Sequence, residues 1–275
     1  MKRSSRIVGI TNHFIQKPKH LFQLTYFSER YNASKSSISE DLTIVDEMFK
    51  HEEIGYLHRI SGAAGGVQFV PSLSREKSIP LIKDMCEKLE DPNRILPGGY
   101  LYMSDLLGNP DIVRQVGQLF ATTFAERNID VVMTVETKGI PLAYAVAAHL
   151  HVPVIIVRRD PKVTEGSSVS INYVSGSSRR IQTMVLPRRS LKEGMKVCIV
   201  DDFMKAGGTI NGMISLLDEF SANVAAIGVL AEADDEEDDR IVEDYISLIK
   251  IKNVNMQNYT IDVSPGNFLT KMGEN

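Results

Sequence analysis

Two adjacent carboxylates, Asp201 and Asp202, follow four apolar residues that read as a buried strand. The loop after them contains Lys205, Ala206, Gly207, Gly208 and Thr209, and an apolar-periodic helix begins near Thr209. Glycines let the backbone approach an anion closely, and a helix start offers unpaired N–H groups and a positive dipole end. The segment therefore predicts a phosphate cradle, and the two acids suit a ligand that also presents hydroxyl groups, as a ribose does.

The non-functional alternative for this segment is a glycine-rich surface turn with two solvated acids. The order of strand, acid pair and Gly-Gly-Thr favours the ligand site. The chain contains no G-x-x-x-x-G-K-[ST] motif, and no G-x-G-x-x-G follows a predicted strand. Nucleoside triphosphatases and dinucleotide-binding enzymes are therefore disfavoured.

Basic residues at the ends of two further strands could complete an anion site. Thr137, Lys138 and Gly139 follow one strand and open a helix, which predicts a second anion-binding nest. Arg158 and Arg159 follow the next strand. The alternative for each of these cations is an ordinary surface charge, and the ligand interpretation is favoured. Phe203 could stack under a base or belong to the core.

Strands and helices alternate from residue 98 onward. We expect strands at residues 99–103, 130–135, 152–157, 181–186, 197–201 and 224–231, and helices at residues 110–128, 140–150 and 209–220. Strands apolar on both faces with helical crossovers predict a mostly parallel α/β sheet. Ligand sites in such sheets lie beyond the carboxyl ends of the strands, where residues 201–209 fall.

The N-terminal region reads as three short helices and a hairpin. We expect helices at residues 6–16 and 20–31, and a third that begins near Ser36 or Ser37 because Ser37 and Glu40 match a capping box. Two short strands follow at residues 55–60 and 67–70.

This layout is that of a winged helix domain, whose third helix would enter the major groove of DNA. The expected DNA-binding residues are small hydroxyl or basic residues, namely Arg3, Arg6, Ser34, Lys35, Ser36, Ser37, Ser39, Thr43 and Arg59. A module for protein interaction or dimerisation is the alternative.

Composition is that of an ordinary globular chain, with 275 residues, 43% apolar and 24% charged. Two cysteines within apolar stretches predict no disulfide framework and no metal site, and suit the cytoplasm. We expect no signal peptide and no membrane span. The net charge of −4 divides unevenly, because residues 1–72 carry a balance of +2 and the remainder −6.

A polar segment at residues 71–78 predicts a linker between a domain of residues 1–72 and one of residues 73–275. A bridging or dimerising helix should follow at residues 79–89. The acidic run at residues 234–239 predicts a solvated loop, the alternative being a divalent-ion site. The tail after residue 250 reads as an added strand.

The acid pair and its loop resemble the fingerprint of type I phosphoribosyltransferases, which hold phosphoribosyl pyrophosphate (PRPP). Residues 28–42, 61–66, 95–100, 137–145 and 201–214 together resemble the bacterial purine operon repressors of the phosphoribosyltransferase type. The resemblance covers nearly the whole chain. It implies a homodimeric repressor of purine synthesis genes that binds double-stranded operator DNA and is released by PRPP.

The resemblance also assigns roles to residues. In such a site the acid pair contacts the ribose, residues 205–209 hold the 5-phosphate, and residues 137–139 with Arg158 or Arg159 meet pyrophosphate. Tyr100 and Tyr173 join the effector-binding set. No cofactor is required beyond PRPP, with which Mg²⁺ could come, and purine nucleotides or guanosine alarmones could share the site.

One difference concerns catalysis. Residues 162–180 resemble the hood loop of adenine phosphoribosyltransferases, in which a Glu before the loop Tyr handles protons at the base. Asn172 precedes Tyr173 here, and an amide cannot act as a general acid or base. We therefore expect no enzyme activity, and the alternative is an active purine phosphoribosyltransferase with an accessory domain.

Overall fold

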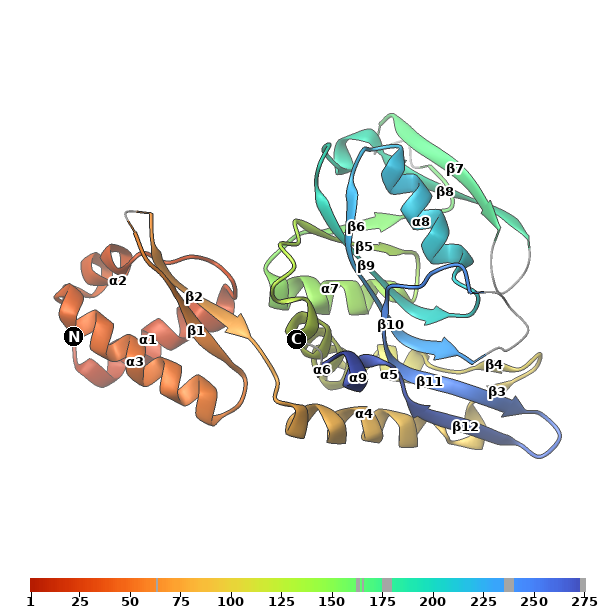
Figure 1. The fold of residues 1–275 in the computed structure, drawn as a ribbon, viewed down its shortest axis with the longest axis horizontal. Coiled ribbons are helices and arrows are strands. Elements are labelled where there is room, and N and C mark those ends of the chain that lie inside the picture. The colour runs from red at the N-terminus through yellow and green to blue at the C-terminus, as the bar shows by residue number, and fades with distance from the viewer. Residues whose placement is uncertain (63, 162–163, 165, 175–179, 235–239, 273–275) are drawn as a thin grey trace.

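The computed structural model describes residues 1–62, 64–161, 164, 166–174, 180–234 and 240–272, and forms two domains joined near α4 (Figure 1). The N-terminal domain has the predicted order of three helices and a hairpin. Its elements are α1 Arg3–Gln16, α2 Leu24–Tyr31, α3 Lys35–His51, β1 Gly55–Ile60 and β2 Gly66–Pro71.

The N-terminal core is a cluster of aromatic and aliphatic side chains from all five elements. Phe27, Phe49 and Leu42 are fully buried, because the apolar stripes of α2 and α3 face the hairpin. The prediction that a helix begins at residue 20 is wrong, since Phe22 pairs in an antiparallel bridge with Val67 of β2. This isolated bridge holds the segment before α2 against the hairpin, and the three helices and the hairpin form a winged helix arrangement.

The second domain holds a six-stranded sheet in the order β12-β11-β10-β9-β5-β6. All neighbours are parallel except β11 and β12. The strands are β5 Val131–Val135, β6 Val154–Val157, β9 Lys196–Met204, β10 Asn223–Ala233, β11 Ile246–Asn255 and β12 Thr260–Pro265. The helices are α4 Arg75–Leu89, α5 Ser104–Leu107, α6 Pro110–Phe124, α7 Gly139–Leu150, α8 Gly208–Asp218 and α9 Phe268–Lys271.

The sheet is buried on both faces, as its apolar strands predict. Alternation along β9 places Cys198 and Val200 in the core with α6 and α7, and Val197 and Ile199 in the core with α8. Helices α6 and α7 cover the side of the sheet toward the N-terminal domain, and α8 covers the opposite side (Figure 1). Because β9 lies inside the sheet, its carboxyl end delivers the acid pair to the middle of the sheet edge.

Two predicted strands do not join the main sheet. Residues 99–103 instead contribute β4 Tyr100–Leu101, which pairs with β3 Ile95–Leu96 in a small hairpin. Residues 181–186 form β8 Ile181–Pro187, which pairs antiparallel with β7 Ser168–Val174. Part of the expected hood loop is therefore a regular hairpin, called the hood hairpin below. Residues 162–163, 165 and 175–179 of that loop lie outside the described residues.

The second half of the segment expected to link the domains, residues 75–78, is helix. Ser74 caps α4 by accepting a hydrogen bond from the backbone N–H of Lys77 at 3.2 Å, so the helix begins at Arg75. Leu73 is buried in the core of the second domain, which leaves little free chain between the domains. Of the predicted acidic loop only Asp234 is described, and its carboxylate pairs with Lys250 at 2.8 Å. No helix among the described residues is long and apolar enough to cross a membrane.

Candidate functional site

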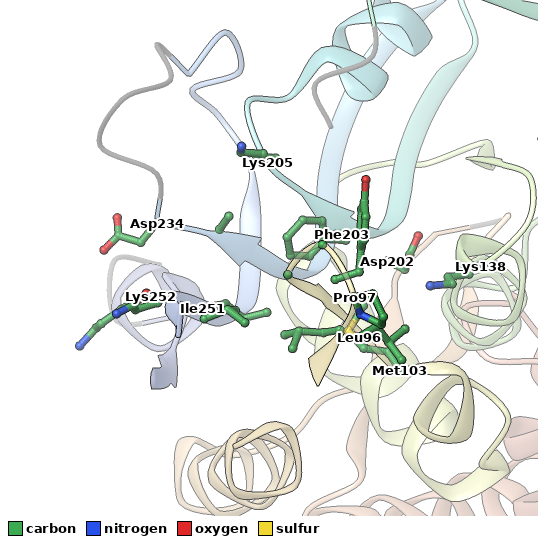
Figure 2. A pocket seen from close by; sticks show the side chains of 17 residues that line it. Leu96, Pro97, Met103, Lys138, Asp202, Phe203, Lys205, Asp234, Ile251 and Lys252 are labelled. Carbon is green, nitrogen blue, oxygen red and sulfur yellow. The ribbon is translucent and has the colours of Figure 1, made fainter. Parts of the chain in front are cut away.

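A cavity of about 900 Å³ lies at the carboxyl end of the sheet, beside the acid pair (Figure 2). It is enclosed by the β3–β4 hairpin, the end of β9 and the far end of β11. Its lining residues are Leu96, Pro97, Gly98, Gly99, Tyr100, Leu101, Met103, Lys138, Asp202, Phe203, Lys205, Ala233, Asp234, Ile251, Lys252, Asn253 and Val254. The volume suits a drug-sized or nucleotide-sized ligand.

The acid pair occupies the end of β9, within the strand rather than after it. Asp201 is 4% exposed, and its Oδ1 accepts the backbone N–H of Asp202 at 3.0 Å. Burial raises the pKa of Asp201 well above its ordinary value, and the neighbouring charge of Asp202 adds to the effect. Burial also raises the pKa of Asp202, against which the Lys138 ammonium acts. Two carboxylates held this way are poised to accept hydrogen bonds or a cation from a ligand.

Residues 137–139 lie against the acid pair. This is the arrangement expected if they and residues 205–209 belong to one site. A Cβ on Gly139 would lie 2.3 Å from Thr134 Oγ1 and 3.2 Å from Asp201 Oδ1. Only glycine therefore lets α7 begin so close to β9. The Lys138 side chain extends toward Asp202 in the cavity (Figure 2), and the Glu136–Thr137 peptide bond is cis.

Arg158 and Arg159 are held at the end of β6 by Glu136, which directly precedes residues 137–139 in the sequence. The Glu136 carboxylate accepts Arg158 Nη1 at 3.3 Å and the backbone N–H of Arg159 at 2.9 Å. The two arginines thus lie beside residues 137–139 but do not line the cavity.

The glycine turn has the geometry of an anion cradle. Gly207 has φ +89°, and a Cβ there would lie 3.0 Å from Val242 Cγ2. The Ala206 carbonyl accepts the backbone N–H of Ile241 at 3.2 Å, so the turn is supported from behind. Helix α8 begins at Gly208, which leaves the first N–H groups of the helix directed at the site.

The hood hairpin packs Tyr173 against α8 rather than into the cavity. A Cβ on Gly212 would lie 2.9 Å from the Tyr173 ring, and the hydroxyl donates to Gln182 at 2.8 Å. Burial raises the pKa of Tyr173, which a hydrogen bond with Thr209 opposes. Asn172 accepts the Thr183 hydroxyl at 3.0 Å within the hairpin. Tyr173 therefore lies beside the first turns of α8, and Asn172 is hydrogen-bonded inside its own hairpin.

The structure gathers the predicted residues into one region with two parts. Tyr100, Lys138, Asp202, Phe203 and Lys205 line the cavity, whereas the glycine turn, the two arginines and Tyr173 flank it. Tyr100 is 61% exposed on its hairpin. Phe203 is half-buried, lines the cavity and also packs against the core, so both of its predicted roles stay open.

Several lining residues were missed by the sequence analysis. They come from the end of β11 and the loop after β10, namely Ile251, Lys252, Asn253, Val254, Ala233 and Asp234. Nothing in their residue types signals a ligand, because they reach the cavity only through the long-range pairing of β10 with β11. The glycines of the β3–β4 hairpin were the one available signal.

A second candidate surface lies on the N-terminal domain, where α3 meets β1. Lys35, Ser36 and Thr43 are exposed on α3. The guanidinium of Arg59 reaches across from β1 and donates to Ser39 Oγ at 3.4 Å and Thr43 Oγ1 at 3.2 Å. One exposed face thus presents hydroxyl groups and a planar cation, which are the groups that contact phosphates and base edges.

Two details of this surface differ from expectation. Ser34, not Ser37, caps α3, because its Oγ accepts the backbone N–H of Ser37 at 3.2 Å. The Arg6 side chain is 12% exposed and its Nε donates to the buried Asp41 at 2.5 Å. The packing therefore engages Arg6 inside the domain instead of directing it toward DNA. Arg3 also contacts Asp41, at 3.0 Å, but its side chain is 53% exposed.

Two protein families match the chain in succession. The family described as "Bacterial purine repressor, N-terminal" matches residues 2–71, and the "Phosphoribosyl transferase domain" matches residues 103–264. These ranges correspond to the winged helix arrangement and to most of the six-stranded sheet with its helices.

Relatives of known name match from end to end. The purine biosynthesis transcriptional repressor PurR of Bacillus subtilis is 57% identical over 274 residues, covering 100% of this chain and 96% of the relative. The purine biosynthesis transcriptional activator PurR of Lactococcus lactis subsp. lactis is 46% identical over 267 residues, covering 97% of this chain and 98% of the relative.

Among solved structures, adenine phosphoribosyltransferase from Saccharomyces cerevisiae superposes with a TM-score of 0.54 at 18% identity. The match covers 62% of this chain and 98% of that enzyme. At this identity the likeness establishes the fold of the second domain, a type I phosphoribosyltransferase-like fold.

Burial of the acid pair makes a prediction about stability. The folded-state pKa of Asp201 lies above its unfolded value, so stability falls as the pH rises through that interval. Replacing Asp201 with Asn removes the buried charge. We expect Asp201→Asn to raise the free energy of unfolding by about 1–3 kcal/mol at mildly alkaline pH, and by progressively less toward acid pH.

Urea unfolding of the full chain at a series of pH values measures this difference. Asp218→Asn, at the exposed end of α8, is the matched control and should show no comparable gain. A gain for Asp201→Asn that is absent, or that shrinks as the pH rises, would contradict the assignment of a destabilising buried carboxylate.

Proposed function

The chain belongs to the family of bacterial purine biosynthesis transcriptional regulators, and from this we propose that it represses purine synthesis genes and is released from operator DNA by PRPP. The observation that carries the effector proposal is the acid pair between two anion-binding turns. PRPP has a ribose with two free hydroxyls, flanked by a 5-phosphate and a pyrophosphate. Its three chemical parts match the three parts of the site.

The fit can be followed group by group. Asp201 and Asp202 would accept the ribose hydroxyls, and the turn at Gly207 with the N-terminus of α8 would hold the 5-phosphate. Lys138, with Arg158 or Arg159, would meet the pyrophosphate. Mg²⁺ prefers oxygen ligands and would arrive with the pyrophosphate. Among the described residues no group of three or more His, Cys, Asp or Glu side chains could hold a metal alone.

The cavity beyond the acid pair has room for more than PRPP. Phe203 offers a stacking surface, and Lys205 and Lys252 add positive charge. Purine nucleotides or guanosine alarmones would place a base there and their phosphates on the same turns. They would then compete with PRPP for one site.

We propose that the site senses PRPP without turning it over. The described strands of the hood hairpin, β7 and β8, contain no carboxylate, and Asn172 stands at the position where a proton-handling Glu is expected. A regulator that consumed its effector would also erase its own signal. As a homodimer acting on chromosomal DNA it would work in the cytoplasm.

DNA binding should depend strongly on salt. We expect the logarithm of the operator association constant to fall with the logarithm of salt concentration, with a slope of about −0.9 for each phosphate neutralised. Lys35→Ala, at the exposed start of α3, should weaken binding to all sequences and reduce the slope by about 0.9. Lys83→Ala on α4 is the matched control. A wild-type slope near zero in mobility-shift titrations would exclude this interface and favour a protein-binding module.

Loss of one carboxylate should produce a repressor that PRPP cannot release. Hydrogen bonds to charged groups contribute roughly 1.5–3 kcal/mol, so Asp202→Ala should lower PRPP affinity about 10- to 100-fold. Operator binding without PRPP should be unchanged, because the winged helix arrangement lies in the other domain. Calorimetry and mobility shifts check the two affinities, with Asp218→Ala as control. Normal release of Asp202→Ala by PRPP would show that the effector binds elsewhere.

The protein should not transfer the phosphoribosyl group. Incubation with PRPP and adenine, hypoxanthine, guanine or xanthine should yield no nucleotide above the background given by Asp202→Ala. That variant is the matched control, since it lacks the ribose contact. Nucleotide formed by the wild type and lost in Asp202→Ala would establish the alternative, an active phosphoribosyltransferase with an accessory domain.

A further inference from the structure

The N-terminal domain docks onto the second domain through the turn between α1 and α2. The Lys19 ammonium donates to the backbone carbonyl of Ala125, at the C-terminal end of α6. Beside it, the His20 ring lies 6.0 Å from the ring of His151, the residue that ends α7. A cavity of about 530 Å³ adjoins these contacts and is lined by residues of both domains.

The Lys19 contact is a directed one. The last carbonyls of a helix lack partners within the helix and lie at its negative dipole end, so an ammonium there is favourable. Lys19 is half-buried, and burial lowers its pKa while Glu126 opposes that effect. Its φ of +58° is uncommon for a residue with a side chain. The backbone and the side chain are thus both held in a specific arrangement.

Contacts continue from Lys19 to the exposed helix of the N-terminal domain. The Lys19 N–H donates to the Phe69 carbonyl in β2 at 2.7 Å. The Phe69 ring packs on Phe49 of α3, with ring centroids 4.4 Å apart. A shift of the turn therefore acts on the hairpin and, through the aromatic pair, on α3.

Contacts also continue from Lys19 to the acid pair. Helix α7 starts at Gly139, in contact with Asp201, and ends beside His20. Helices α7 and α6 are in close contact, since a Cβ on Gly117 would lie 2.7 Å from the Ala145 carbonyl carbon. Helix α7, which begins at the acid pair, and helix α6, which packs against α7, thus both end at the docked turn (Figure 1).

The domains also meet at a second place, near the covalent connection. Ser74 Oγ donates to the Glu53 carboxylate at 3.0 Å, and the Lys77 ammonium pairs with the same carboxylate at 3.8 Å. These contacts lie next to the covalent connection between the domains, which keeps the contacting residues close together. The Lys19 contact has no such tether, so it is the one that can open while the domains remain joined.

We propose that Lys19 is a positioning residue that transmits the effector response, holding α3 in one orientation relative to α6 and α7 until PRPP shifts α7. The inference rests on the proposed function, because it assumes that PRPP binding and operator binding are coupled. Such coupling is reciprocal and is measured as the ratio of operator affinities without and with PRPP. A series of contacts between two sites does not by itself demonstrate coupling, so the affinity ratio must be measured directly.

Lys19→Met tests the proposal, because it keeps the apolar stem and removes the ammonium. We expect the affinity ratio to fall at least about fivefold toward one, while PRPP affinity of the DNA-free protein stays within about threefold of wild type. Lys17→Met, an exposed neighbouring cation, is the matched control and should keep the wild-type ratio. Lys19→Asn is the second variant, since Asn tolerates the left-handed backbone and preserves the turn.

The outcomes separate this inference from the proposed function. Variants of Lys19 that keep the wild-type ratio while the wild type responds to PRPP would overturn the role of Lys19 alone. A wild-type ratio of one would overturn the effector response and this inference with it. Loss of the ratio through lost PRPP affinity would also overturn it, since Lys19 would then support the effector site and not the coupling.

Discussion

The close approach of Gly139 to Asp201 is the constraint on which the site depends. Any side chain at position 139 would collide with Thr134, so α7 could not begin beside the carboxyl end of β9. With glycine there, Lys138 reaches Asp202 and the start of α7 faces the acid pair. The same helix lies against α6 through Gly117, so the position of one backbone atom sets the arrangement of two helices. Because protein interiors are close-packed, the neighbouring atoms cannot shift far enough to accept a larger residue at position 139.

Most of the fold could be predicted from the sequence where local pattern and tertiary role agree. Strands β5, β9 and β10 are apolar runs buried on both faces, and α7 and α8 start at the glycines that the pattern indicated. The failures have one cause, since an apolar run does not reveal its pairing partner. Residues 181–186 are as apolar as a sheet strand, yet they pair with β7. Phe22 likewise lies within the predicted helix of residues 20–31 but pairs with Val67 instead.

The candidate site shows the same division. Its acids, glycine turn and cations were predictable, because each lies at the carboxyl end of a strand or directly after it, in one short motif. Ile251 and Asn253 were not, because only the parallel pairing of β10 and β11 brings them to the cavity. Arg6 illustrates the converse, since a basic residue near a terminus suggests DNA contact while its partner, Asp41, lies 35 residues away. Buried ion pairs of this kind leave no local signature in sequence.

The hood hairpin has a consequence beyond the ligand. Arg158, at the end of β6, forms an antiparallel bridge with Val185 of β8, with N–O distances of 3.1 Å and 2.8 Å. Strand β6 is an edge strand of the sheet, and at this bridge β8 of the same chain covers part of that edge. The unpaired backbone groups of an exposed edge strand can pair with another molecule and so promote aggregation. Removing the hood hairpin would therefore expose unpaired backbone groups at this edge of the sheet, so a segment beside the candidate site also protects the molecule from edge-to-edge aggregation.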